Sequence, residues 1–181
     1  MVFKKKGGKI AINDLGVLLN ESYKSKDKTN KNINNKYELD EDLSTDKTKV
    51  YRKMKLPLND IIMRDETHKI SKDGFYIINL DNSKGKGTHW CCLFYYPLHS
   101  CYNDSFGFVP PVEIEKKIKP FTYNDRDIQD FNSDACGYYA LAFIKFLHNK
   151  QNKKEAFKQF LQMFKNKTIE NDDILHKYLF G

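Results

Sequence analysis

The sequence DACGYYALAFIKFLHN, at residues 134–149, is apolar on nearly every face when it is wound as a helix. Such a helix has no side to turn to water, so we expect it at the centre of the fold with other elements covering it. Ser133 or Asp134 can cap its first turn, which places Cys136 at the helix N-terminus. The sequence therefore predicts a buried helix that carries a cysteine at its start.

Three runs of β-branched and aromatic residues precede this helix, and turn residues bound each of them. Residues 74–81, 88–97 and 99–104 are predicted to be neighbouring strands of one sheet, and 121–124 a further short strand. Helices are predicted over 112–118, 153–165 and 170–180. The predicted fold class is α+β: a central mixed or antiparallel sheet, the Cys136 helix packed beneath it, and further helices around.

With 181 residues and 40% hydrophobic content, the chain suits a single domain over residues 1–181. Residues 11–22 predict a short N-terminal helix, and the polar segment 24–49 is expected to be a mobile loop. The sequence has no run of about 18 apolar residues, and its N-terminal apolar patch is too short for a signal sequence. We expect a soluble, intracellular protein with no membrane partner.

Four cysteines, Cys91, Cys92, Cys101 and Cys136, show no C-x-x-C spacing. This argues against a zinc site and against a disulfide framework, so we expect reduced thiols and no metal. Cys91 and Cys92 fall in the middle of a predicted strand, where packing in the core is the expected role.

The net charge of +7 permits binding to polyanions, because clustered lysines neutralise phosphates. The lysines are nevertheless spread along the chain, which favours a basic solvated surface. Non-specific binding to DNA, with stimulation of activity at low salt, is the alternative interpretation.

Three motifs supply the side chains that covalent catalysis by a thiol needs: GTHW at 87–90, CYNDSFG at 101–107 and NSDACG at 132–137. Cys136 would be the nucleophile, and His89 the base that takes its proton. Asp104 would accept the Nδ1 proton of His89 and stabilise the imidazolium. Gln129 would donate its side-chain amide to the oxyanion, together with the backbone N–H of Cys136.

Each of these residues also has an ordinary role in packing or on the surface. Asn103 competes with Asp104 as the group that orients His89, since adjacent strand residues point to opposite faces. The presence of all three motifs in one chain favours the catalytic interpretation of His89, Gln129 and Cys136.

The motifs resemble those of the adenain-like cysteine proteases, which are relatives of the Ulp-type deSUMOylases. GTHW is similar to the segment around their catalytic histidine, and CYNDSFG to the segment with their orienting acid. NSDACG resembles their N-S-x-x-C-G, with Gln129 seven residues before Cys136, and IIMRDE at 61–66 resembles an F-M-R-D segment of viral members. The resemblance spans residues 51–148 and favours Asp104 over Asn103.

This resemblance implies a papain-like fold and peptide-bond hydrolysis through an acyl-enzyme, without a cofactor. It implies a protease of a virus or virophage that cleaves capsid or other virion precursors in the host cytoplasm, the viral factory or the virion. Removal of SUMO- or ubiquitin-like modifiers is the alternative activity. It also implies a narrow substrate groove formed by Trp90, Gly85 and Gly87 that favours glycine beside the scissile bond, with core packing as the alternative role of Trp90.

Overall fold

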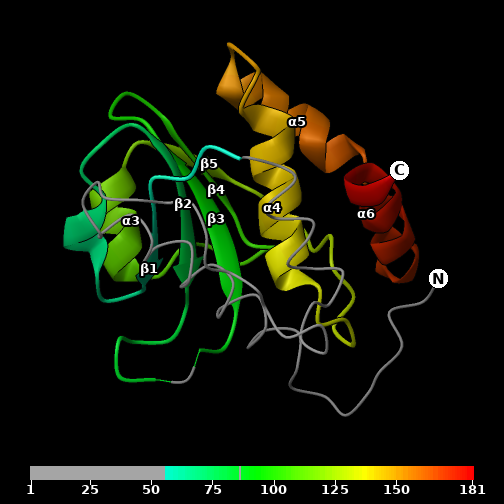
Figure 1. Cartoon of the computed structure of the whole chain (residues 1–181), viewed down its shortest axis with the longest axis horizontal. Helices are drawn as coiled ribbons and strands as arrows, with labels where there is room; N and C mark the ends of the chain where they lie inside the picture. The colour runs from blue at the N-terminus through cyan, green and yellow to red at the C-terminus, as the bar shows by residue number, and fades with distance from the viewer. Residues whose placement is uncertain (1–55, 86) are drawn as a thin grey trace, which may run out of the picture.

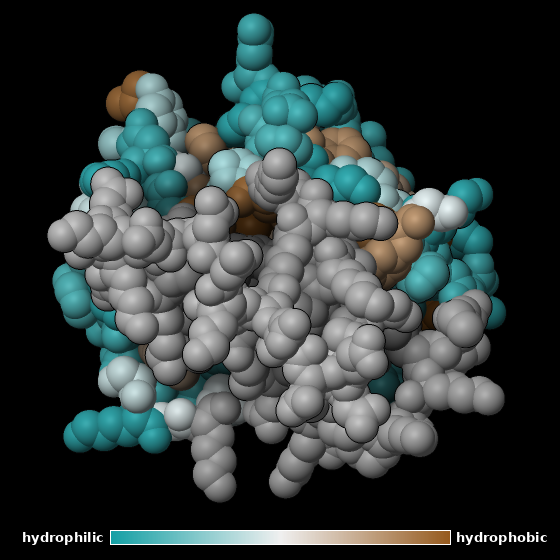
Figure 2. Space-filling view, in the orientation of Figure 1, coloured by the Kyte–Doolittle hydropathy of each residue, from teal (hydrophilic) through white to brown (hydrophobic). Residues whose placement is uncertain are grey.

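The computed structural model describes residues 56–85 and 87–181. The helix expected at 11–22 and the mobile segment expected at 24–49 lie outside the described residues. No helix in the described part of the chain is long and apolar enough to cross a membrane. Most of the described residues that are visible in Figure 2 are hydrophilic, and a few hydrophobic ones lie among them.

In the described part of the chain, five strands form one sheet, and their order in the sheet follows their order in the chain (Figure 1). They are β1 (Asp60–Met63), β2 (Gly74–Asn79), β3 (Trp90–Tyr95), β4 (Ser100–Asn103) and β5 (Phe121–Tyr123). Strands β2, β3 and β4 pair antiparallel, whereas β1 runs parallel to β2 and β5 parallel to β4. The four predicted strands are confirmed, and the sheet is mixed.

Strand β1 is the strand that the sequence pattern did not predict. It is an edge strand of four residues, in which Ile61 lies opposite Ile77 and Ile62 opposite Ile78. Four residues offer too few alternations to distinguish a strand from any other short apolar run, so its pairing becomes visible only in the fold.

Helix α4 (Cys136–Leu147) packs on one face of the sheet, where it contacts β3. Helix α5 (Lys153–Gln162) contacts α4 and β4, and α6 (Asn171–Phe180) packs on α4. Helix α3 (Val112–Ile118) lies on the opposite side of the sheet (Figure 1). Short 3-10 helices span Thr67–Lys69 and Thr168–Glu170. The predicted α+β fold class, with a buried helix that carries Cys136, is therefore confirmed.

The two faces of the sheet bury separate apolar clusters, because successive strand residues point to opposite faces. Phe75 and Ile77 pack on the side of α4, whereas Tyr76 and Ile78 pack on the side of α3. Within α4 every residue from 136 to 144 is buried, as the absence of a polar face predicts. The sheet, α5 and α6 together provide the cover that this helix requires.

The aromatic contacts between α4 and α5 generate a stability prediction. Phe160 is fully buried, and its ring contacts those of Phe143 and Phe164 at centroid distances of 5.7 and 5.2 Å. Phe160→Ala should lower the free energy of unfolding by about 3–5 kcal/mol, because it removes apolar contacts and leaves a cavity. Urea denaturation measures the effect. Leu98→Ala is the control, since Leu98 is 73% exposed and its loss should change stability by less than about 0.5 kcal/mol.

Candidate active site

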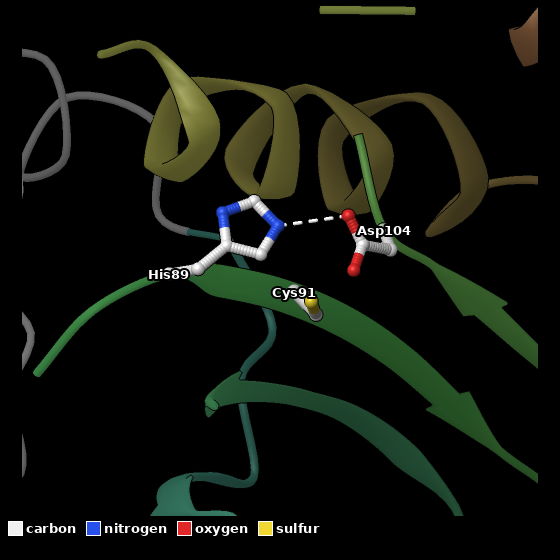
Figure 3. Close-up of side chains that lie close together, drawn as sticks. All are labelled: His89, Cys91 and Asp104. Carbon is white, nitrogen blue, oxygen red and sulfur yellow. Dashed lines mark hydrogen bonds and ion pairs between the residues drawn. The ribbon is translucent and has the colours of Figure 1, made fainter. Parts of the chain in front are cut away.

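His89 and Asp104 form a hydrogen-bonded pair at one end of the sheet (Figure 3). His89 directly precedes β3, and Asp104 directly follows β4. Because β3 and β4 are antiparallel neighbours, the start of β3 lies beside the end of β4, and the two side chains meet there. His89 Nε2 lies 2.8 Å from Asp104 Oδ1. The carboxylate is fully buried and the imidazole is 15% exposed. The sequence motifs that were expected to supply a base and its orienting acid are thus brought together.

One detail of the expected pair is wrong. The nitrogen of His89 that contacts Asp104 is Nε2, not Nδ1. The ring extends from the start of β3 towards the end of β4, so its outer nitrogen reaches the carboxylate, and Nδ1 lies on the side of the ring away from Asp104 (Figure 3). With Nε2 bound, Nδ1 is the nitrogen left for a thiol.

The surroundings of His89 favour its protonated form. Burial lowers the pKa of the imidazole, but hydrogen bonds to the Asp104 carboxylate, the Cys136 thiol and the Cys91 thiol outweigh burial and raise this pKa well above its ordinary value. The thiol of the proposed nucleophile is thus among the groups that favour the charged form of His89. An imidazolium held between a carboxylate and a thiol is the arrangement that stabilises a thiolate.

Asp104 is held by contacts on both sides of its backbone. Its N–H donates to Asn124 Oδ1 at 3.0 Å, and Asn124 Nδ2 donates back to the Asp104 carbonyl. The N–H of Phe106 donates to Asp104 Oδ1 at 2.9 Å, and that of Gly107 to the Asp104 carbonyl at 2.8 Å. Asp104 Oδ1 thus accepts from His89 and from the backbone at once, which fixes the carboxylate before any substrate arrives.

Asn103 does not take the orienting role. The residue is buried, and its Oδ1 has no hydrogen-bond partner among the described residues, whereas Asp104 contacts the imidazole directly. Asn103 is the last residue of β4 and Asp104 directly follows it, and of the two it is Asp104 that bonds the His89 ring.

Cys136 is the first residue of α4 and is 3% exposed. The expected cap is wrong: the N-cap residue is Ala135 and it offers no side-chain hydrogen bond, while Ser133 Oγ accepts from the Ala135 N–H at 3.2 Å. The expected place of Cys136 in the first turn is confirmed. Backbone N–H groups in a first helical turn have no acceptor within the helix, so those of Cys136 and Gly137 remain suited to an anion.

Gln129 is fully buried, and contacts within the protein hold both ends of its amide. Its Oε1 accepts from Ser105 Oγ at 2.6 Å, and its Nε2 donates to the Ser133 carbonyl at 2.7 Å. These bonds join the loop that follows β4 to the turn that precedes Cys136. The structure thus gives Gln129 a bracing role in the site, and its role as an oxyanion donor stays a prediction.

The residues expected to line a substrate groove also have structural contacts. Trp90 is 5% exposed and belongs to the same apolar cluster as Cys136. A Cβ at Gly85 would lie 2.0 Å from the Asp81 carboxylate, and Gly87 has a φ of +87°. The Gly87 N–H donates to Asp81 Oδ2 at 3.1 Å, so Asp81 closes the loop around both glycines. A groove role for the three residues stays a prediction.

Cys91 lies beside the His89–Asp104 pair, which its position in the middle of a strand did not predict (Figure 3). The nearest ligand atoms of Cys91, His89 and Asp104 all lie within 4.8 Å of one another. A thiol, an imidazole and a carboxylate are the ligand types that zinc accepts. His89 Nε2 and Asp104 Oδ1 are already bound to each other, however, so a metal here would have to break the pair.

Two functional contacts were missed by reasoning from the sequence. Asn124 directly follows β5 and bonds Asp104, which lies 20 residues earlier in the chain, and no local sequence pattern predicts such a contact. Phe106 lies inside the motif CYNDSFG and stacks on the His89 ring at a centroid distance of 4.8 Å. Its position two residues after the predicted acid was the available signal.

Comparisons with known proteins add a weak likeness. No family model matches the sequence, and no curated protein matches it. Among solved structures, the chain is similar to the crystal structure of the ASFV pS273R protease, with 18% sequence identity and a TM-score of 0.37 over 60% of this chain and 44% of that one. The chain thus spans less than half the length of that protease. A likeness this weak carries no argument about activity, which rests on the side-chain geometry.

Cys136 should be the one thiol of the described residues that is alkylated quickly at pH 6–7. Burial raises the pKa of Cys91 and of Cys101 to about 12 and that of Cys92 well above its ordinary value, whereas Cys136 has the imidazolium and the helix N-terminus beside it. Mass spectrometry after a brief treatment with iodoacetamide measures the labelling. Preferential labelling of Cys91, Cys92 or Cys101 would contradict the assignment.

Asp104→Asn should lower the pKa of His89, because the neutral amide no longer stabilises the imidazolium. In the wild type the ring stays protonated as the pH rises past 6.5, its ordinary pKa, and the stability that the pair contributes is lost only as the pH passes the raised value. In the variant the ring should lose its proton at a lower pH, and the stability that the pair contributes should be lost at a lower pH as well. NMR titration of the His89 ring measures the shift, and an unchanged titration would show that Asp104 does not control the charge.

Proposed function

We propose that this protein is a cysteine endopeptidase. The observation that carries the proposal is the position of His89, which binds the buried Asp104 carboxylate through Nε2. The Cys136 thiol at the start of α4 is among the groups that raise the pKa of this imidazole. A base, its orienting acid and a nucleophile at a helix N-terminus make up the machinery of thiol acyl transfer.

In the proposed reaction the Cys136 proton resides on His89 as part of the imidazolium, and the Cys136 thiolate attacks the carbonyl carbon of the scissile bond. The backbone N–H of Cys136 donates to the oxyanion. Gln129 Nε2 donates to the Ser133 carbonyl at 2.7 Å and lies 3.5 Å from Ser133 Oγ, and we propose that its second N–H is the other donor. His89 then gives its proton to the leaving amine, and water releases the acyl group from Cys136.

The resemblance of the motifs to adenain-like proteases supports a finer proposal. We infer that the substrates are capsid or other virion precursors, cleaved next to a glycine in the host cytoplasm, the viral factory or the virion. This proposal includes no metal and no cofactor. The net positive charge supports non-specific DNA as a further proposed partner. Assays with a virion precursor and with SUMO or ubiquitin conjugates decide between a maturation protease and an isopeptidase.

Cys136→Ala and His89→Ala should each reduce kcat by several orders of magnitude on whichever substrate is cleaved, because the covalent step needs both groups. Asp104→Ala should reduce kcat less than His89→Ala, since Asp104 orients the ring without exchanging its proton. Single-turnover kinetics on folded variants measures these effects. Asn103→Ala is the matched control, and a larger loss at Asn103 than at Asp104 would overturn the assignment.

A further inference from the structure

Three rings are stacked in a row beside the candidate active site. The His89 ring lies on Phe106 with centroids 4.8 Å apart and planes 28° apart, and Phe106 lies on Phe131 at 5.2 Å and 4°. Parallel rings at such a distance form the offset stack that aromatic pairs prefer. Phe106 is partly buried, while Phe131 is 72% exposed.

The two phenylalanines come from the loop that carries Asp104 and the loop that carries Gln129. Phe106 follows Asp104 by two positions, and its N–H donates to the Asp104 carboxylate. Phe131 follows Gln129 by two positions and precedes Cys136 by five. The stack therefore extends the site from the base outward to solvent.

Stability does not account for Phe131. A phenylalanine side chain stabilises a fold in proportion to the apolar area that it removes from water, and most of this gain is absent for a ring that is 72% exposed. A flat apolar surface that is held in place by a stack and left open to solvent is suited to receive an apolar side chain of a substrate.

The position of the stacked rings beside His89 indicates which part of the substrate would contact them. His89 must protonate the leaving amine, so the chain that follows the scissile bond has to pass beside the imidazole. We propose that Phe131, supported by Phe106, forms a specificity subsite for an aliphatic or aromatic side chain on the first residue after the scissile bond. This proposal rests on the proposed function, and it specifies which side chain the protease prefers on the leaving-group side of the scissile bond.

A peptide series that varies only this residue, with glycine before the scissile bond, tests the subsite. The ratio of kcat/KM for leucine over serine should be about tenfold or more in the wild type, and Phe131→Ala should reduce it by about tenfold, since one apolar contact in a pocket typically discriminates by 10–200-fold. Phe131→Tyr should restore the ratio. Leu98→Ala is the matched control, because Leu98 is 73% exposed and follows the opposite end of β3.

A ratio that Phe131→Ala leaves unchanged would overturn the subsite. A merely structural role would lower kcat/KM for both peptides together and would also leave the ratio unchanged.

A second readout works without turnover. The rate at which N-benzyliodoacetamide alkylates Cys136, relative to iodoacetamide, should fall in Phe131→Ala and not in Leu98→Ala, since the benzyl group loses its apolar surface. If both reagents label Cys136 and the ratio of their rates is the same in the wild type and in Phe131→Ala, the subsite is wrong. The proposed thiol chemistry would not be affected by that result. No labelling of Cys136 by either reagent would instead overturn the proposed function, and the subsite with it.

Discussion

The burial of α4 against the sheet is the constraint on which the site depends. The helix has no polar face, and every residue from 136 to 144 is enclosed by β3, α5 and α6. Packing therefore fixes the position of α4 from all sides, and with it the position of Cys136, the first residue of the helix. Strand β3, which contacts α4, begins directly after His89. The proposed nucleophile and the proposed base are thus placed by two rigid elements in contact with each other, which hold a pair of side chains more closely than loops do.

The position of Asp104, the proposed orienting acid, depends on the parallel pairing of β4 with β5. Because β4 and β5 run parallel, their carboxyl ends lie side by side at the same end of the sheet. Asp104 follows β4 and Asn124 follows β5, so the Asn124 amide can bind both the N–H and the carbonyl of Asp104. Asn124 Nδ2 also donates to the Arg126 carbonyl at 3.1 Å. One buried amide thus ties the end of β4 to the loop after β5.

Most elements of this fold could be predicted from the sequence, because their signals are local. Helix α4 has its all-apolar surface, and the strands have their aromatic runs. The triad candidates were also predictable, since short motifs carry them. Contacts that depend on the fold were not: the choice of Nε2 over Nδ1 depends on how far the His89 ring extends, and the bond between Asn124 and Asp104 depends on strand pairing. The Ala135 cap was missed because Ser133 Oγ bonds the Ala135 N–H instead of capping the helix.

The charge of His89 results from opposing effects of its surroundings. Burial, to which the Phe106 stack contributes, disfavours the imidazolium, and the hydrogen bonds to Asp104 and to the thiols outweigh it. Since Asp104 is fully buried, salt screens its attraction for the imidazolium far less than it screens a surface pair. The folded protein therefore determines the pH at which His89 loses its charge. The same aromatic cover that makes the charge costly also excludes the water that would weaken the bond holding it.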